Sequence, residues 1–207
     1  MRIGIDFDNT IVSYDRLFHK VAAEQEVIPR DLAATKLAVR DYLRRIDKED
    51  VWTEMQGYVY GSRMGEAEAY PDAVDFLIWA RDSGIETFII SHKTEYPFRG
   101  PRHDLHAAAR GWVHDSLKAA GRALVPPERV FFETTKDAKL DRVRQTKCNV
   151  FIDDLPEILL APAFPENVDR ILFDPDAHHR RGRDGLFTLG SWSDIRAHLE
   201  TRCLTIR

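Results

Sequence analysis

Residues 3–10 read IGIDFDNT, an apolar run that ends in two aspartates, Asp6 and Asp8, two positions apart. The run at 3–5 is bounded by charged residues and is consistent with a short buried strand. Taken alone, the two acids are consistent with a solvated turn after that strand. The rest of the sequence decides between this interpretation and a functional one.

Apolar runs and helical segments alternate from Pro71 onward. Strands that alternate with helices indicate a parallel sheet covered by helices on both faces. We therefore expect an α/β fold with a Rossmann-like three-layer α/β/α core. The expected strands cover 3–5, 85–91, 129–133, 149–153 and 170–174, and the expected helices cover 71–84, 103–121, 137–146 and the residues after Ser193.

Residues 13–70 interrupt this alternation. Apolar residues after Ser13 recur at spacings of three and four, the pattern of one helix face, and Pro29 ends that pattern. The expected elements are a helix after Ser13, helices over 31–46 and 48–57, and an irregular stretch over 57–71. We interpret 13–70 as a small, mainly helical cap inserted into a core made of 1–12 and 71–207.

Composition narrows the possible functions. The chain has 207 residues, of which 43% are hydrophobic, enough for one domain with a small addition. A net charge of -4 gives no indication of a nucleic-acid polymer or a membrane surface as partner. No signal peptide is visible, and the two cysteines, Cys148 and Cys203, lack metal-ligand spacing. These features favour a reduced, cytoplasmic setting.

Polar side chains lie where the expected strands end, which is where open parallel sheets bind ligands. Four carboxylates that converge there would repel one another unless a cation neutralised them, and their oxygens suit Mg²⁺. A lysine and a hydroxyl beside them would suit a phosphoryl group. The residues are Asp6, Asp8, Ser91, Asp153 and Asp154, with Lys136 and Lys139 at the start of a helix.

This set of residues resembles the haloacid dehalogenase-like hydrolase superfamily through four motifs in order along nearly the whole chain. The stretch 6–10, DFDNT, is similar to the first motif, DxDxT, and Ser91 is similar to the second. The third motif is a lysine, for which we favour Lys139 over Lys136 because an apolar residue follows it at the helix start. The acidic pair at 153–154 is similar to the fourth motif.

The resemblance implies how a phosphate ester would be hydrolysed. Asp6 would attack phosphorus and form an aspartyl-phosphate, and Asp8 would protonate the leaving oxygen and then activate water. Mg²⁺ would be held by the Asp6 carboxylate, the backbone carbonyl of Asp8, and both Asp153 and Asp154. Ser91 would donate to a phosphate oxygen, and the lysine would offset the negative charge.

Four more residues beside these motifs are candidates for phosphate or substrate binding. Asn9 stands where many members of the superfamily have glycine, and Thr10 would orient Asp8 or support the loop. His92 and Lys93 begin a basic loop, 92–103. This loop either recognises a second anionic group or is an ordinary solvated loop.

Two other groups of residues have open roles. Aromatic and polar residues near the end of the insertion either contact the non-phosphate part of a substrate or pack the small core of the cap. These are Trp52, Gln56, Tyr58, Tyr60 and Arg63. The run His178-His179-Arg180-Arg181 has no evident third metal ligand, so we interpret it as surface or as a rim that faces the substrate.

The leading hypothesis is a Mg²⁺-dependent phosphatase that acts on a small phosphate ester, such as a sugar phosphate or a nucleoside monophosphate. The resemblance implies that the dehalogenase branch lacks an acid at position 8, since a halide leaves without a proton. A phospho-accepting receiver domain is a second hypothesis, but there the acidic pair precedes the nucleophile. A catalytically silent binding protein is a third, although every motif residue is present.

Overall fold

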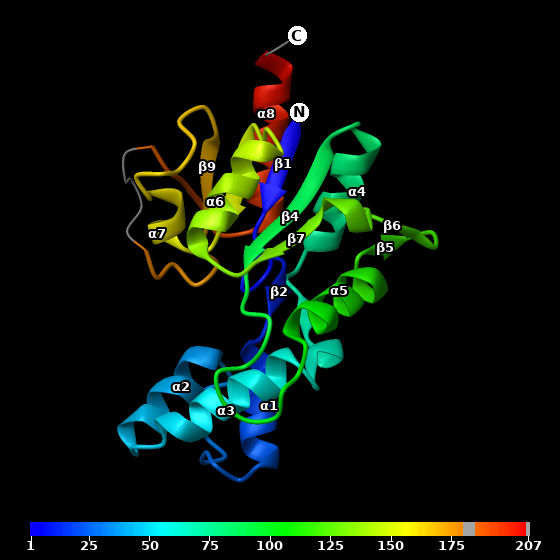
Figure 1. Cartoon of the computed structure of the whole chain (residues 1–207). Coiled ribbons are helices and arrows are strands. Elements are labelled where there is room, and N and C mark those ends of the chain that lie inside the picture. Colours follow the sequence, from blue (N-terminus) through cyan, green and yellow to red (C-terminus); the bar gives the residue numbers. More distant parts are fainter. Residues whose placement is uncertain (180–184, 206–207) are drawn as a thin grey trace.

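The computed structural model of the chain describes residues 1–179 and 185–205, with side chains described as far as residue 201. Its centre is a six-stranded sheet in the order β10-β9-β8-β1-β4-β7, in which all neighbouring strands are parallel (Figure 1). The parallel sheet predicted from the alternation of elements is therefore confirmed. The strands are β1 (Arg2–Ile5), β4 (Glu86–His92), β7 (Val130–Glu133), β8 (Val150–Asp153), β9 (Asp169–Phe173) and β10 (Phe187–Leu189).

The register of the sheet brings the motif-bearing strand ends together. β1 lies between β4 and β8, and Ile5 is paired with Ile89 on one side and Ile152 on the other. Asp6, which follows Ile5, and Asp153, which follows Ile152, therefore leave the sheet at the same level. Strands buried on both faces need nearly continuous apolar residues, which explains why these runs do not alternate.

Helices cover both faces of the sheet, as expected. Helices α4 (Ala73–Asp82), α5 (Leu105–Ser116) and α8 (Trp192–Thr205) belong to one apolar cluster, and α6 (Lys136–Gln145) and α7 (Pro156–Leu159) belong to another. Alternate strand residues divide between the two clusters: Ile89 belongs to the first, whereas Phe88 and Ile90 belong to the second. This division is the side-chain alternation of a strand packed on both faces.

Several expected boundaries were wrong. The helix expected over 103–121 ends at Ser116, and β5 (Lys118–Ala119) pairs with β6 (Arg122–Ala123) in a hairpin. The turn between them places Ala120 and Gly121 at positive φ, as a tight hairpin turn requires, so Gly121 marks a turn rather than a helix end. Four other short elements were not expected from the sequence: β10, α7, and β2 (Val12–Ser13), which pairs with β3 (Glu68–Ala69).

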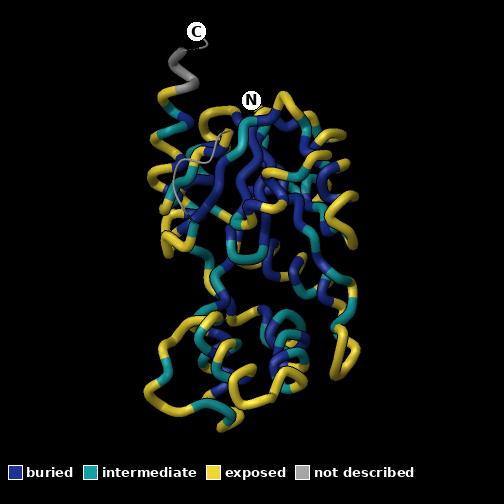
Figure 2. Tube along the Cα trace, turned by 90° about the vertical axis from the view of Figure 1, so that its left-hand side faces the viewer, coloured by how far each residue is buried: buried dark blue, intermediate teal, exposed yellow. Residues whose placement is uncertain are grey.

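Helices α1 (Asp15–Glu24), α2 (Lys36–Arg45) and α3 (Glu49–Tyr60) pack together beyond the carboxyl ends of the strands (Figures 1 and 2). We call these three helices the helical unit. Its apolar residues are continuous with the cluster under α4, α5 and α8. The division of the chain into a core and a cap stays a prediction.

Two of these helices differ from their expected bounds. Helix α2 begins five residues later than expected, because the hydroxyl of Thr35 accepts a hydrogen bond from the Ala38 N–H (3.1 Å) and so caps the helix there. Helix α3 continues past Gly57 to Tyr60, so the stretch expected to be irregular begins later.

The loop between β4 and α5, residues 93–104, packs against α3. A Cβ atom at Gly57 would lie 2.7 Å from the Cβ of Pro97, and one at Gly61 would lie 2.6 Å from the Cβ of His103. Such distances are too short for two carbon atoms in contact. The two glycines therefore allow the loop to approach the helix more closely than any other residue type would permit.

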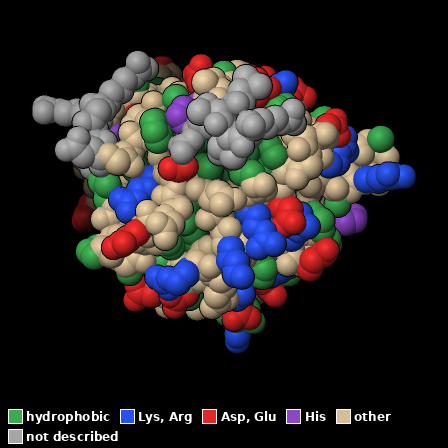
Figure 3. Space-filling model, turned by 90° about the horizontal axis from the view of Figure 1, so that it is seen from above, with side chains coloured by type: hydrophobic (Ala, Val, Ile, Leu, Met, Phe, Trp, Pro, Cys, Tyr) green, Lys and Arg blue, Asp and Glu red, His purple; other side chains and the backbone are tan. Residues whose placement is uncertain are grey.

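None of the helices in the described part of the chain is long and apolar enough to cross a membrane. Cys148 is buried and free, and burial raises the pKa of its thiol, whereas the side chain of Cys203 lies outside the described residues. The face opposite the helical unit carries Lys and Arg side chains interspersed with Asp and Glu (Figure 3). Ion pairs such as Arg2 with Glu86 (3.0 Å) join residues of the two charges.

Candidate active site

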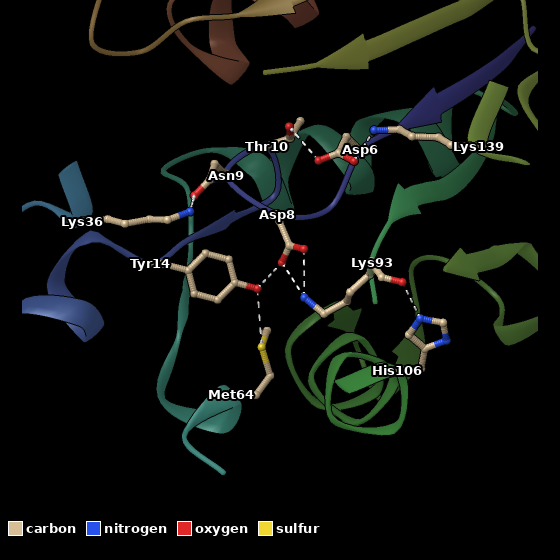
Figure 4. Close-up of polar contacts among 10 residues, drawn as sticks. All are labelled: Asp6, Asp8, Asn9, Thr10, Tyr14, Lys36, Met64, Lys93, His106 and Lys139. Atoms are coloured by element: carbon tan, nitrogen blue, oxygen red, sulfur yellow. Dashed lines mark hydrogen bonds and ion pairs between the residues drawn. The ribbon is translucent and has the colours of Figure 1, made fainter. Parts of the chain in front are cut away.

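Asp6 lies at the end of β1 and contacts a buried lysine. Its backbone N–H donates to the Ile152 carbonyl of β8 (2.9 Å), which continues the sheet pairing by one residue. The Lys139 ammonium, from the first turn of α6, lies 2.6 Å from one oxygen of Asp6 (Figure 4). It also lies 2.6 Å from one oxygen of Asp153. All three side chains are almost completely buried. Lys136 instead pairs with Glu157 at the surface (3.4 Å), so the geometry favours Lys139 as the lysine of the site.

Three carboxylates form a cluster that could hold a metal ion. One oxygen from each of Asp6, Asp153 and Asp154 lies within 4.8 Å of the others. Burial and repulsion from neighbouring carboxylates raise the pKa of Asp154 well above its usual range. Burial, together with Asp6, raises the pKa of Asp153 to about 7, against the opposing effect of Lys139. Carboxylates that resist ionisation in this way gain from a bound cation, and an all-oxygen donor set suits Mg²⁺.

Thr10 and Asn9 shape the turn that follows Asp8. The Thr10 hydroxyl lies 3.4 Å from an oxygen of Asp6 and 3.4 Å from an oxygen of Asp154, so it can donate to either carboxylate. Asn9 has a φ of 59°, in the left-handed region that glycine and asparagine tolerate best. This conformation explains why an asparagine can occupy a position where glycine is common.

Asp8 points away from the pair of Asp6 and Lys139 (Figure 4). The Tyr14 hydroxyl donates to one of its oxygens (2.5 Å), and the Lys93 ammonium lies 2.9 and 2.8 Å from the two oxygens. Burial alone would raise the pKa of Asp8, but Lys93 and Tyr14 outweigh it and lower the pKa below its usual value. Asp8 is therefore held as a carboxylate beside the helical unit.

Ser91 and His92 end β4. Ser91 is 1% exposed, and its hydroxyl has no hydrogen-bond partner within the described residues. A buried hydroxyl without a partner is costly, so a site that binds an anion there explains its presence better than packing does. His92 is half-buried, and burial lowers the pKa of its imidazole. The roles predicted for both residues stay predictions.

The cations of the 93–104 loop are engaged with protein groups. Lys93 pairs with Asp8, and the Arg99 guanidinium lies 3.6 Å from Asp50 of α3. Arg102 stacks over the Tyr96 ring at 3.9 Å from its centre. These contacts hold the loop against Asp8 and α3, and one of them lies within the loop.

The five candidate residues of the insertion divide between packing and the site. Trp52 is buried against Phe18, with ring centres 4.8 Å apart, and Arg63 pairs with Glu24 and Glu66 within the insertion. Tyr60 contacts the groups around Asp8. Its ring centre lies 4.9 Å from that of Tyr14 and 4.7 Å from the Lys93 ammonium, whereas Gln56 and Tyr58 are half-buried on the same helix.

A pocket of about 240 Å³ lies between the first turn of α2 and the loop after β9. Asn9 and Asp154 line it, so it adjoins the acidic cluster. His178 and His179 also line it, which agrees with a rim position, whereas Arg180 and Arg181 lie outside the described residues.

The sequence did not single out three residues that contribute to this region. Tyr14 has the spacing of an apolar helix position, and Lys36 follows an ordinary helix cap, so neither carries a signal of its own. Asp174 ends β9 and is buried, and its carboxylate accepts from the backbone N–H groups of His178 and His179 (2.9 Å each). Its place at a strand end is the same signal that identified Asp6.

No protein-family model matches the sequence, and no curated protein matches it. Solved structures do match. A HAD family hydrolase from Deinococcus radiodurans R1, with bound phosphate and sodium, is 17% identical with a TM-score of 0.55, over 97% of this chain and 95% of that one. The magnesium-bound HAD-hydrolase YfnB of Bacillus subtilis is 14% identical with a TM-score of 0.58, over 96% and 97%. A dehalogenase is 13% identical with a TM-score of 0.57, over 95% and 96%.

These similarities extend over almost the full length of each chain, and they concern the fold. The chain has the α/β fold of the haloacid dehalogenase-like hydrolases. The structures that match include one with phosphate and one that is a dehalogenase, so the reaction has to be argued from the residues of this chain.

Proposed function

We propose that the protein is a Mg²⁺-dependent phosphatase that hydrolyses a small phosphate ester through an aspartyl-phosphate on Asp6. The observation that carries this proposal is the position of Asp6, which lies between Lys139 and the two acids at the end of β8, with a second carboxylate two residues further along the chain. A nucleophile, a fixed positive charge and an acid–base group are the parts that transfer of a phosphoryl group to a carboxylate requires.

Each residue has a defined task in this proposal. Asp6 attacks phosphorus, and its carboxylate is fixed for attack by Lys139. Asp8, which Lys93 and Tyr14 hold as a carboxylate before substrate binds, takes up a proton, gives it to the leaving oxygen and then takes one from the attacking water. The hydroxyl of Ser91, which has no partner among the described side chains, donates to a phosphate oxygen. Lys139 compensates the negative charge of the nucleophile and the phosphoryl group together.

The donor set fits Mg²⁺. Asp6, Asp153 and Asp154 would hold the ion with carboxylate oxygens, together with the backbone carbonyl of Asp8. When bound, the ion supplies positive charge that polarises the phosphoryl oxygens. Burial, together with repulsion from Asp6 and Asp153, raises the pKa of Asp154, and this supports the assignment because a bound cation would offset both effects.

Asp8 favours phosphate ester hydrolysis over dehalogenation. An alkoxide is a poor leaving group and needs a proton, whereas a halide does not. Tyr14 and Lys93 hold the Asp8 carboxylate two residues after the nucleophile. Release of a halide would not use this carboxylate. The substrate class, a sugar phosphate or a nucleoside monophosphate, and a cytoplasmic location belong to the same proposal.

A phosphate-release assay tests the proposal. The purified protein is incubated with a panel of sugar phosphates, nucleoside monophosphates and organic acid phosphates, with Mg²⁺ or with EDTA. We expect release only with Mg²⁺, and a loss of at least about a thousandfold in Asp6→Asn. Asp115→Asn, at an exposed position on α5, is the matched control and should retain full activity.

Two further measurements separate the alternatives. Enzyme quenched in acid after reaction with ³²P-labelled substrate should carry a label that hydroxylamine removes, because hydroxylamine cleaves an acyl phosphate. Halide release from 2-haloacids without any phosphate release would overturn the proposal in favour of dehalogenation. Full turnover of phosphate esters by Asp6→Asn would overturn the assignment of the nucleophile.

A further inference from the structure

The pocket of about 240 Å³ beside Asp154 has cationic side chains on the wall that faces the loop after β9. Lys36 and Arg40 lie one helical turn apart on α2, and both line the pocket. Asn9, which neighbours Asp8, lines the pocket together with Asp154. A phosphate ester bound at Asp6 would therefore have this pocket next to it.

Lys36 lacks a carboxylate partner. No carboxylate of the described residues lies within ion-pair distance of its ammonium, which donates to the neutral side-chain oxygen of Asn9 (3.2 Å) and is also hydrogen-bonded with Tyr60. The rings of Tyr14, Phe18 and Tyr60 surround it, with centres 5.6 to 5.8 Å away. Aromatic rings stabilise a cation, but they leave it able to bind an anion.

Two of the four acids that line the pocket accept hydrogen bonds from backbone groups. Asp15 accepts from the backbone N–H of Lys36 (2.8 Å), and Asp174 accepts from two backbone N–H groups of the loop after β9. The Asp176 carboxylate lies 3.7 Å from the ring of His178. Asp154, which also lines the pocket, and Asp8 attract the Lys36 ammonium from a distance and raise its pKa against the opposing effect of burial, so Lys36 is a fixed cation at the pocket wall.

Three of the four acids of the candidate site have another lysine at ion-pair distance. Asp6 and Asp153 share Lys139, and Asp8 has Lys93 at 2.8 Å. Lys36 comes from a different element, helix α2, lines the pocket, and forms no ion pair with these three acids.

We propose that this pocket binds a second anionic group of the substrate, a carboxylate or a phosphate, through Lys36 with a contribution from Arg40. The inference rests on the proposed phosphatase activity and names its substrate class: phosphate monoesters whose alcohol carries a further negative charge. An ammonium group that is already held in place gains a charge-assisted hydrogen bond from such a group and gains much less from a neutral hydroxyl.

Matched pairs of esters test the proposal. Glycerol 3-phosphate and 3-phosphoglycerate differ by a carboxylate, and fructose 6-phosphate and fructose 1,6-bisphosphate differ by a phosphate. We expect a higher kcat/KM for the more anionic member of at least one pair, and the pair that responds distinguishes carboxylate from phosphate. In Lys36→Gln the ratio of the two kcat/KM values should fall about tenfold or more.

Three control variants make the result specific. Lys36→Arg keeps the charge and should keep most of the preference. Lys20→Gln, on the outer face of α1, should leave the ratio unchanged. Arg40→Gln should lower the ratio in the same direction as Lys36→Gln. Circular dichroism confirms that each variant is folded before its kinetics are compared.

The second anion site can be tested even if the phosphatase proposal fails. No phosphate release from any ester, with or without Mg²⁺, contradicts the phosphatase alone. In that case binding decides: 3-phosphoglycerate should raise the melting temperature of Asp6→Asn more than glycerol 3-phosphate does, and the difference should disappear in the double variant with Lys36→Gln. Two results would overturn the second anion site. One is a higher kcat/KM of the wild-type protein for the less anionic ester of both pairs. The other is an equal fall in kcat/KM for both esters of a pair in Lys36→Gln.

Discussion

The Lys139 ammonium lies 2.6 Å from a carboxylate oxygen of Asp6, although the two residues are 133 positions apart in the sequence. Both side chains are nearly inaccessible to solvent, and the same ammonium holds Asp153 at an equal distance. A buried charge that loses its partner is far more costly than a buried pair, so this contact determines both the stability and the chemistry of the site.

Replacement of Lys139 by Met should lower the free energy of unfolding by about 3 kcal/mol at neutral pH without Mg²⁺, because three carboxylates would then face one another without the lysine. Urea denaturation measures this change. Lys136→Met is the matched control, and its change should stay within about 0.5 kcal/mol because the Lys136 pair with Glu157 is exposed. Equal effects of the two substitutions would contradict the special position of Lys139.

Replacement of Ser91 by Ala should lower the activity without lowering the stability of the fold. The hydroxyl has no partner within the described residues, so its removal should leave the free energy of unfolding unchanged or raise it by about 1 kcal/mol. Phosphate release should fall about a hundredfold, because a donor to the phosphoryl oxygens is lost. A fall in stability with unchanged turnover would show that the hydroxyl serves packing rather than substrate.

Mg²⁺ binding should strengthen as the pH rises. Burial raises the pKa of Asp153 to about 7, and the pKa of Asp154 is raised as well. A carboxyl whose pKa is higher in the folded state contributes stability below about pH 4, and this contribution is lost as the pH rises through about 7. Protons compete with the ion over the same range, so the increase in melting temperature caused by MgCl₂ should grow between about pH 5.5 and 7.5.

Ionic strength and a site variant serve as controls for this titration. NaCl at matched ionic strength should produce no comparable rise in melting temperature. Asp154→Asn should reduce the effect of MgCl₂ at every pH. A response to MgCl₂ that stays constant across the range would show that the ion binds elsewhere.

Two glycines in different helices should respond in opposite ways to replacement by Ala. Gly57→Ala should lower the free energy of unfolding by about 1–2 kcal/mol, because its Cβ would lie 2.7 Å from Pro97. Gly111→Ala, in an exposed position of α5 with no atom within 4 Å of the new Cβ, should raise it by about 0.5–1 kcal/mol. Urea denaturation of both variants measures the difference, and a stabilised Gly57→Ala would show that the loop yields without cost.

The fold was predictable because its determinants are local and repeated. Each buried strand is a short apolar run, and each run leads into a helix, which together specify a parallel sheet. The strands of two or three residues, β2, β3 and β10, contain too little sequence to show a pattern. The hairpin after Ser116 was missed because Gly121 is equally compatible with a helix end and a tight turn.

The site was predictable only in part. The acids at strand ends were found because the topology of a parallel sheet places such positions at one edge. Lys136 and Lys139 are one helical turn apart, so local sequence gives little basis for choosing between them, and the packing of α6 decides. The contacts of Tyr14 with Asp8 and of Lys36 with Asn9 cross between the helical unit and the sheet, and no local pattern encodes them.

The loop of residues 93–104 joins two parts of the molecule through one short segment. Its first residue, Lys93, holds Asp8, and its later residues, Pro97 and His103, lie against the glycines of α3. If the helical unit turned to admit a substrate, α3 would carry this loop with it and Lys93 would shift against Asp8. Movement of the helical unit and loosening of the contact between Lys93 and Asp8 would then occur together. Protonation of the leaving alcohol by Asp8 would therefore depend on the position of the helical unit.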